Sequence, residues 1–256
     1  MHLTLIGIGT GNPEHMTLQA IRAMNAQDVI LIPKKGVGKA DLAELREAIC
    51  AEMLSTEQTT IIPFDLPVRD ETTQDYLQRV DEWHDAIALA WQDALASQNN
   101  PQRVALLVWG DPSLYDSTLR IAARLKPQPT LEVIPGITSL QALTAAHAIP
   151  INQIGSPFVV TTGRRLRDEG WPQGQTTIAV MLDGNCSFQT LKAGDYHIWW
   201  GGYVGMKEQI TCQGPLAEVS DQIVQLRAEA REKHGWIMDI YVLRRRGAGL
   251  PRPACA

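Results

Sequence analysis

Leu3-Thr-Leu-Ile-Gly-Ile-Gly-Thr-Gly-Asn-Pro13 is the stretch that decides the fold of this chain. Its apolar half is typical of a buried first β-strand, and three glycines on alternate positions follow at once. Glycine has no Cβ, so a loop built in this way lets a ligand approach the main chain closely, although some such loops are only tight turns. Ligands of α/β sheets bind outside the carboxyl ends of the strands. The stretch therefore predicts an α/β fold with a ligand loop after its first strand.

Two later segments repeat this order of a strand followed by a Gly or Pro turn. The apolar run 104–108 leads into Trp109-Gly-Asp-Pro112, and the run 131–134 leads into Pro135-Gly-Ile-Thr138. If the strands are parallel, all three turns share one edge of the sheet, where their amides and the carboxylate of Asp111 would face a ligand. The alternative for Asp111 is an ordinary turn residue that binds its own main chain.

A dinucleotide fold is the first alternative for the opening loop. In nicotinamide enzymes the glycine loop runs directly into a helix, and an acidic residue after the second strand binds the adenosine ribose. Here Asn12-Pro13 interrupts the loop, and the second strand, 29–32, ends at Pro33-Lys-Lys35. These residues disfavour a nicotinamide-dependent oxidoreductase.

The composition is that of an ordinary globular protein. Its 28 acidic and 23 basic residues give a formal charge of −5, which argues against a broad surface for nucleic acid. No apolar run approaches the roughly 20 residues of a membrane span, and no secretory signal is visible, so we expect no membrane partner. The four cysteines and six histidines are scattered, so we expect free thiols in the cytoplasm and no metal site.

The alternation of strands and helices runs along the chain twice. The second series starts with a strand at 158–162, which is followed by the cationic turn Gly163-Arg-Arg-Leu-Arg167. We therefore expect one α/β domain over residues 1–150, a second over 151–246, and a flexible tail at 247–256. The charges of Arg244-Arg-Arg246, which lead into the tail, are expected to be solvated.

Taken together, these motifs resemble the tetrapyrrole methylases, the S-adenosylmethionine-dependent enzymes of cobalamin and sirohaem biosynthesis. The resemblance covers nearly the whole chain except the tail; each motif is loose, but their shared order and spacing make it specific. It rests on Gly7-x-Gly9-x-Gly11-Asn12-Pro13 with Thr17, Gly110-Asp111-Pro112 with Tyr115, Val133-Ile-Pro-Gly-Ile-Thr-Ser139 with Ala148-Ile-Pro150, Val180-Met-Leu182, and Gly201-Gly202.

Within the family, the sequence of these motifs is most similar to that of members that methylate C-1 of precorrin-5 and release acetate. The segments that carry this closer likeness are Gly9-Thr-Gly-Asn-Pro-Glu-His15, Trp109-Gly-Asp-Pro-Ser-Leu-Tyr115, Thr161-Thr-Gly-Arg-Arg165, Met181-Leu-Asp-Gly184 and Trp199-Trp-Gly-Gly-Tyr203.

The resemblance implies two αβα domains that form a trough, the class III methyltransferase fold, and a homodimer. It implies S-adenosylmethionine as the cofactor, with S-adenosylhomocysteine as its product, held largely by main-chain groups. The positions that match the family's cofactor contacts are Pro13, Gly110, Asp111, Leu114, Thr138, Ser139, Leu182 (or its neighbour Met181) and Gly202.

The substrate that the resemblance implies, precorrin-5, carries many carboxylates, and guanidinium groups suit such groups well. Candidate side chains for the chemistry are Asp111 nearest the cofactor, and Arg164 and Arg165 on substrate carboxylates. Lys34 and Lys35, at another strand end, would add to this clamp, and Tyr115 and His147 are weaker candidates for proton transfer. For each of these charged residues, the alternative is an ordinary exposed side chain with no role in the site. Related first-step methylases carry an aspartate, proposed as a base, where this chain has Pro33, so that role is not transferred.

Other activities stay open on the sequence alone. A relative of the same fold could methylate a different precorrin carbon, a diphthamide precursor on a protein, or an RNA ribose, although the acidic balance disfavours RNA. A ligand-binding module without catalysis is a further alternative.

Overall fold

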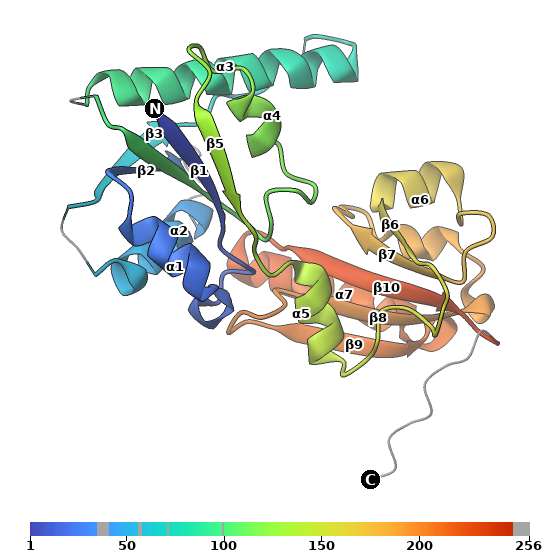
Figure 1. Ribbon diagram of the computed structural model, residues 1–256. Coiled ribbons are helices and arrows are strands. Elements are labelled where there is room, and N and C mark those ends of the chain that lie inside the picture. The colour runs from blue at the N-terminus through green and yellow to red at the C-terminus, as the bar shows by residue number, and fades with distance from the viewer. Residues whose placement is uncertain (35–40, 56–57, 71, 99, 248–256) are drawn as a thin grey trace. The chain divides into compact units, whose positions relative to one another are not determined.

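The computed structural model describes residues 1–34, 41–55, 58–70, 72–98 and 100–247. The chain divides into two compact units, Met1–Thr138 and Ser139–Ala256. Each unit contains one five-stranded sheet, with helices packed on its faces (Figure 1). The predicted fold class, α/β with two αβα units, is therefore confirmed.

The first unit is built on a fully parallel sheet with the strand order β3-β2-β4-β1-β5. Its strands are β1 (His2–Gly7), β2 (Val29–Lys34), β3 (Thr60–Asp65), β4 (Arg103–Val108) and β5 (Thr130–Ile134). Its helices are the short η1 (Pro13–His15), then α1 (Leu18–Asn25), α2 (Asp41–Met53), α3 (Tyr76–Ala96) and α4 (Thr118–Ala122). Because β1 lies between β4 and β5, the three predicted turns leave the same edge of the sheet.

Strand β1 is buried beyond His2 because helices cover both faces of its sheet. Leu5 belongs to the same apolar cluster as Trp91 of α3, on one face. Ile6, its neighbour in the strand, belongs to the opposite cluster with Met24 of α1. Side chains of a strand alternate between faces, so a strand covered on both sides reads as a nearly continuous apolar run. The opening stretch has this pattern.

The second unit is built on a mixed sheet with the order β6-β7-β10-β8-β9. Its strands are β6 (Val159–Thr162), β7 (Thr177–Met181), β8 (Tyr196–Gly202), β9 (Ile210–Pro215) and β10 (Asp239–Arg245). Its helices are α5 (Ser139–Ala146), α6 (Gly163–Glu169), α7 (Leu216–His234) and the short η2 (Ser187–Thr190) and η3 (Ala193–Asp195). Strand β10 is antiparallel to both β7 and β8, so β6, β7 and β8 all end at one edge.

Helix α5 belongs to the second unit, whereas the sequence placed it in a first domain ending at 150. Its Leu140 and Leu143 share an apolar cluster with Trp199 of β8 and Val242 of β10. The division between the units therefore falls before α5, between Thr138 and Ser139.

The cationic turn expected at residues 163–167 is instead the first turn and a half of helix α6. Thr162 explains the helix start, because its hydroxyl accepts a hydrogen bond from the amide of Arg165 at 3.3 Å. A threonine in this position satisfies one of the free amides that every helix N-terminus carries.

The expectation that Arg244 is solvated is wrong. Its side chain is 1% exposed within β10 and donates to the hydroxyl of Thr177 and to the carbonyls of Pro150 and Ile151. A buried guanidinium needs such partners because an unpaired buried charge is costly. The predicted tail lies outside the described residues from 248 onward.

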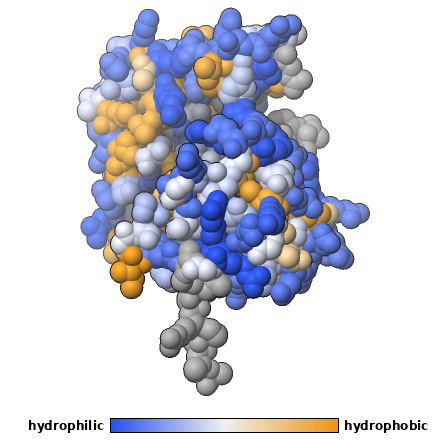
Figure 2. All heavy atoms as spheres, turned by 90° about the vertical axis from the view of Figure 1, so that its right-hand side faces the viewer, coloured by the Kyte–Doolittle hydropathy of each residue, from blue (hydrophilic) through white to orange (hydrophobic). Residues whose placement is uncertain are grey.

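Several remaining expectations concern the surface and the cysteines. No helix in the described ranges combines the length and apolar character that crossing a membrane requires. Figure 2 shows a face on which hydrophilic side chains predominate and hydrophobic ones form separate groups. Cys50, Cys186 and Cys212 are buried free thiols, and burial raises the pKa of Cys50 and of Cys186 to about 11, while Cys255 lies outside the described residues.

Candidate functional site

The turns that follow β1, β4 and β5 touch one another through their main chains, at four glycines that we call the glycine junction: Gly7, Gly9, Gly110 and Gly136. The amide of Gly110 donates to the carbonyl of Gly9 at 2.7 Å, and the amide of Gly9 donates back at 3.3 Å. A Cβ on Gly7 would lie 2.6 Å from the nitrogen of Gly136, and one on Gly136 would lie 2.0 Å from the oxygen of Gly110. Backbone packs directly on backbone here, so no other residue fits at Gly7 or Gly136.

Asp111 ties the junction together through its side chain. One carboxylate oxygen accepts from the amide of Gly136 at 2.9 Å, and the other accepts from the amide of Ser113 at 2.8 Å and from its hydroxyl. Partial burial raises the pKa of Asp111, but the hydrogen bonds from Ser113 and Gly136 outweigh it and hold the pKa below its ordinary value. Asp111 is therefore an ionised acceptor at neutral pH, and it is better suited to holding the loop than to taking up a proton.

The other predicted contacts of the first unit lie in the loops that follow β1, β4 and β5. Gly110 has a left-handed backbone (φ +66°), and a Cβ there would lie 3.9 Å from the Cα of Thr138. The amide of Leu114 donates to the carbonyl of Asp111 at 3.2 Å. Pro13 begins η1, a short helix capped by the side chain of Asn12. Main-chain groups of Gly110, Asp111, Leu114 and Thr138 are thus gathered where β4 and β5 end.

In the second unit, two of the predicted contacts, Leu182 and Gly202, lie at the edge where β7 and β8 end. Leu182 directly follows β7, is 65% exposed, and has a left-handed backbone (φ +54°). Gly202 ends β8 opposite Asp239 of β10, and Ser139 is the first residue of α5. A left-handed leucine costs about 1 kcal/mol, and such strain persists where its surroundings enforce it.

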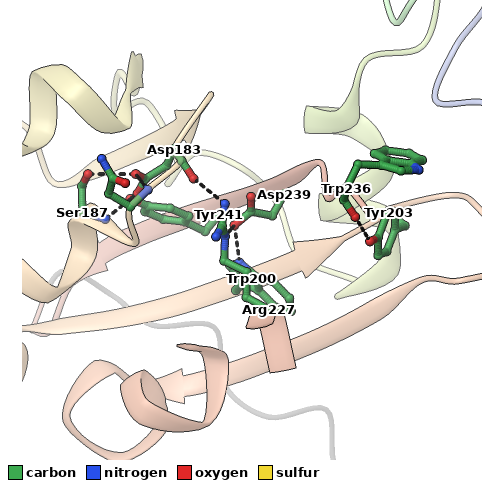
Figure 3. A network of polar contacts seen from close by, with 9 residues as sticks. Asp183, Ser187, Trp200, Tyr203, Arg227, Trp236, Asp239 and Tyr241 are labelled. Carbon is green, nitrogen blue, oxygen red and sulfur yellow. Dashed lines mark hydrogen bonds and ion pairs between the residues drawn. The ribbon is translucent and has the colours of Figure 1, made fainter. Parts of the chain in front are cut away.

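A buried group of polar side chains enforces the turn after Leu182, and we call it the Asp183 network: Asp183, Ser187, Trp200, Arg227, Asp239 and Tyr241 (Figure 3). Asp183 accepts hydrogen bonds from the amides of Asn185 (3.1 Å) and Ser187 (2.6 Å). It also accepts from the hydroxyls of Ser187 (2.9 Å) and Tyr241 (2.6 Å). Burial and the nearby carboxylate of Asp183 raise the pKa of Tyr241, so the phenol keeps its proton and donates.

Arg227 of α7 extends this network to the strand that begins beside Gly202. Its guanidinium donates to a carboxylate oxygen of Asp239 at 3.1 Å and to the carbonyl of Asp183 at 3.2 Å. The indole of Trp200 donates to the same oxygen of Asp239 at 3.0 Å. Burial raises the pKa of Asp239, although Arg227 and Trp200 oppose that shift.

The second unit has its own required glycine, because a Cβ on Gly163 would lie 2.3 Å from the Cγ of Asp183. This contact brings the start of α6 against the network. The sequence marks Asp183 only as a residue that follows a strand. Its partner Tyr241 lies far along the chain, and no local pattern connects the two positions.

The structure brings the predicted cations together less clearly than it does the main-chain contacts. Arg165 binds Glu169 of its own helix through two hydrogen bonds, at 3.0 and 2.8 Å, and lowers the pKa of that carboxyl. Arg164 is exposed on α6, and Lys34 is exposed at the end of β2. Lys35 lies outside the described residues.

The two candidates for proton transfer differ in their surroundings. Tyr115 is 44% exposed and has a left-handed backbone (φ +51°) in the loop that contains Asp111. His147 follows α5, and its Nε2 lies 3.0 Å from the carbonyl oxygen of Trp200. Burial lowers the pKa of His147 despite this hydrogen bond, so the ring is neutral and held in place at neutral pH.

These features fit a bulky organic cofactor bound through the main chain. Among the junction glycines, Gly110 leaves its Cβ position open, with the nearest described atom 3.9 Å away. As a separate finding, no group of three His, Cys, Asp or Glu in the described part of the chain is arranged to hold a metal ion. Residues 2–220 match the family model of the tetrapyrrole (corrin/porphyrin) methylases. The chain belongs to the tetrapyrrole methylase family.

This tetrapyrrole methylase is 48% identical over 248 residues to a precorrin-6A synthase (deacetylating) of Sinorhizobium sp, and the match covers 95% of each chain. A precorrin-2 C(20)-methyltransferase of Sinorhizobium sp is 30% identical over 177 residues, which are 64% of this chain and 69% of the relative.

Solved structures of tetrapyrrole methylases share the fold. A cobalamin-synthesis-related protein of Corynebacterium diphtheriae has a TM-score of 0.80 at 36% identity, covering 95% of this chain and 98% of the other. A uroporphyrin-III C-methyltransferase of Thermus thermophilus, solved with S-adenosylhomocysteine, has a TM-score of 0.58 at 18% identity, covering 95% and 92%. At that identity the second likeness supports the fold alone.

Proposed function

We propose that this tetrapyrrole methylase is a precorrin-6A synthase of the deacetylating type. It transfers a methyl group from S-adenosylmethionine to C-1 of precorrin-5, and water releases the two-carbon acyl group as acetate. The observation that carries this proposal is the 48% identity to a precorrin-6A synthase, which extends over 95% of both chains. A match of this extent spans both units of the chain.

We propose that the cofactor is held by the residues that match the family's contacts: Pro13, Gly110, Asp111, Leu114, Thr138, Ser139, Leu182 and Gly202. When bound, S-adenosylmethionine supplies an electrophilic methyl group. The chain's own part is to fix the geometry, since in-line transfer depends on the alignment of nucleophile, carbon and leaving sulfur. Asp111 acts here as a positioning residue, because its carboxylate holds the amide of Gly136.

Release of the acyl group makes a different demand on the protein. Water must attack a carbonyl carbon, which requires removal of a proton and stabilisation of the developing negative charge. The hydrogen bonds from Gly136 and Ser113 lower the pKa of Asp111, which makes it a weak base for this step.

Turnover of precorrin-5 tests the proposed function. Purified protein with precorrin-5 and S-adenosylmethionine is expected to form one acetate and one S-adenosylhomocysteine for each corrinoid methylated at C-1. Methylation at another carbon without acetate would favour the second candidate, a methyltransferase acting elsewhere on the ring, to which the 30% identity with a precorrin-2 C(20)-methyltransferase points. A nicotinamide-dependent activity would instead require NADP binding and no binding of S-adenosylhomocysteine.

We also propose that α6 supplies cations for the substrate carboxylates. Arg164→Ala is expected to raise KM for precorrin-5 several-fold, and Arg165→Ala to raise it less, because Arg165 already binds Glu169. Arg231→Ala, an exposed arginine of α7, is the matched control. The affinity for S-adenosylhomocysteine should stay unchanged in all three, and an unchanged KM in both α6 variants would remove these arginines from the substrate site.

The family resemblance further implies a homodimer that acts in the cytoplasm, and we carry both forward as proposals. Light scattering on the purified protein tests the first, because the chain has a mass of 28.3 kDa. A single species of that mass would contradict the dimer.

A further inference from the structure

A cavity of about 230 Å³ lies inside the first unit, at the same sheet edge as the glycine junction. The ends of β2, β3 and β4 line it, together with α2, α3 and α4. Its apolar walls include Phe64, Trp83, Ile87, Trp91 and Ile121, and its polar ones Arg46, Asp116, Ser117 and Thr118. None of the residues assigned above to the cofactor or to the α6 cations lines this cavity.

A fixed cation lies on the cavity wall. Arg46 is held there because its Nε donates to the carbonyl of Leu107 at 3.0 Å. Burial lowers the pKa of Arg46, and the attraction of Asp116, which acts in the opposite direction, does not cancel this effect. Asp116 itself accepts from the amide of Thr118 at 2.6 Å. A guanidinium in such surroundings is stabilised by anionic oxygens, so the wall suits a ligand that carries a carboxylate.

A donor on the same cavity lacks an acceptor. Trp91 is 2% exposed, and its indole N–H has no hydrogen-bond partner among the described residues. A buried donor without an acceptor destabilises the fold, which is why nearly all such groups in proteins are paired. The ring of Trp91 lines the cavity, so a ligand that binds there packs against it.

We propose that this cavity is a subsite for one carboxylate-bearing side arm of the tetrapyrrole, with Arg46 as the residue that binds the carboxylate. The proposal rests on the proposed function, which supplies a substrate with such arms. Pockets that hold whole drug-sized ligands have volumes of roughly 300–1,000 Å³, so this cavity is too small for the macrocycle and suits a short substituent. The arm's methylenes would pack on the aromatic walls, while its carboxylate would reach Arg46.

Binding of two synthetic corrins tests the subsite, one with all side arms as free carboxylates and the other with the same arms as primary amides. The protein is expected to bind the carboxylate form at least about tenfold more tightly, since a hydrogen bond to a charged group contributes that much. Arg46→Gln should reduce this preference several-fold, with the remainder coming from the arginines of α6, and Arg46→Lys should reduce it less. Arg22→Gln, an exposed arginine of α1, should keep the full preference.

A second variant covers the case in which Arg46→Gln fails to fold. Ser117 lines the cavity, and its side chain makes no capping hydrogen bond to α4, so Ser117→Phe narrows the cavity without removing a helix cap. It should weaken binding of both corrins at least about tenfold while leaving S-adenosylhomocysteine affinity unchanged. Wild-type corrin binding in folded Arg46→Gln and Ser117→Phe proteins would overturn the subsite.

The outcomes also separate this inference from the proposed function. If the wild-type protein methylates precorrin-5 and releases acetate, yet both variants keep its KM, only the subsite fails. If the wild-type protein neither binds a corrin nor turns over precorrin-5, the proposed function fails and the subsite fails with it.

Discussion

Replacing Gly136 by alanine is expected to destabilise the first unit by about 3 kcal/mol and to weaken binding of S-adenosylhomocysteine at least tenfold. The added Cβ would lie 2.0 Å from the oxygen of Gly110 and 2.9 Å from the main chain of Gly7. Backbone atoms cannot turn away as a side chain can, so β5's turn must separate from those of β1 and β4. That movement also breaks the hydrogen bond from Gly136 to Asp111. Urea unfolding and calorimetric titration measure the two effects.

Gly194→Ala is the matched control for this substitution. A Cβ at Gly194 meets no described atom within 4 Å, and its helix η3 lies in the second unit. The control should keep the wild-type unfolding free energy within about 0.5 kcal/mol and the wild-type affinity. An alanine at 136 with unchanged affinity would show that the glycine junction does not form part of the cofactor site.

The contrast between the two units shows which features a sequence can predict. The first unit depends on segments whose patterns are local: a buried apolar strand, then a turn of Gly and Pro, repeated at β1, β4 and β5. Parallel pairing then fixes where the turns meet, so the pattern alone is enough to place Gly110, Asp111 and Thr138 at one edge of the sheet. The helix start at Thr17 is equally local, because its hydroxyl accepts from the amide of Ala20 and caps α1.

Features that depend on distant partners could not be predicted in this way. Arg244 looks like the start of a basic tail until β10 places it beside the carbonyls of Pro150 and Ile151. Helix α5 follows the first sheet along the chain, yet its apolar face matches the second. Arg46 is one of many helical arginines, and only the tertiary fold places it on a cavity wall with Trp91. In each case the free energy that stabilises the placement comes from burial against residues far along the sequence.

Asp183→Asn is expected to destabilise the second unit by about 3 kcal/mol, although the two side chains have nearly the same shape. One carboxylate oxygen accepts from the amide of Asn185, and the other accepts from the amide of Ser187. In whichever direction the new side-chain amide points, its nitrogen faces a main-chain N–H that cannot reverse its role. A buried donor then faces a donor, while the charge that Tyr241 and Ser187 stabilised is lost.

The same substitution should weaken binding of S-adenosylhomocysteine, because the turn that holds Leu182 in its left-handed conformation (φ +54°) would relax. Tyr241→Phe removes a single donor to Asp183 and should cost about 1 kcal/mol, which sets the scale for one bond of the network. Asp221→Asn, at an exposed position of α7, is the control and should unfold as the wild type does. If Asp183→Asn costs no more than Tyr241→Phe, the carboxylate does not hold the turn by its acceptor geometry.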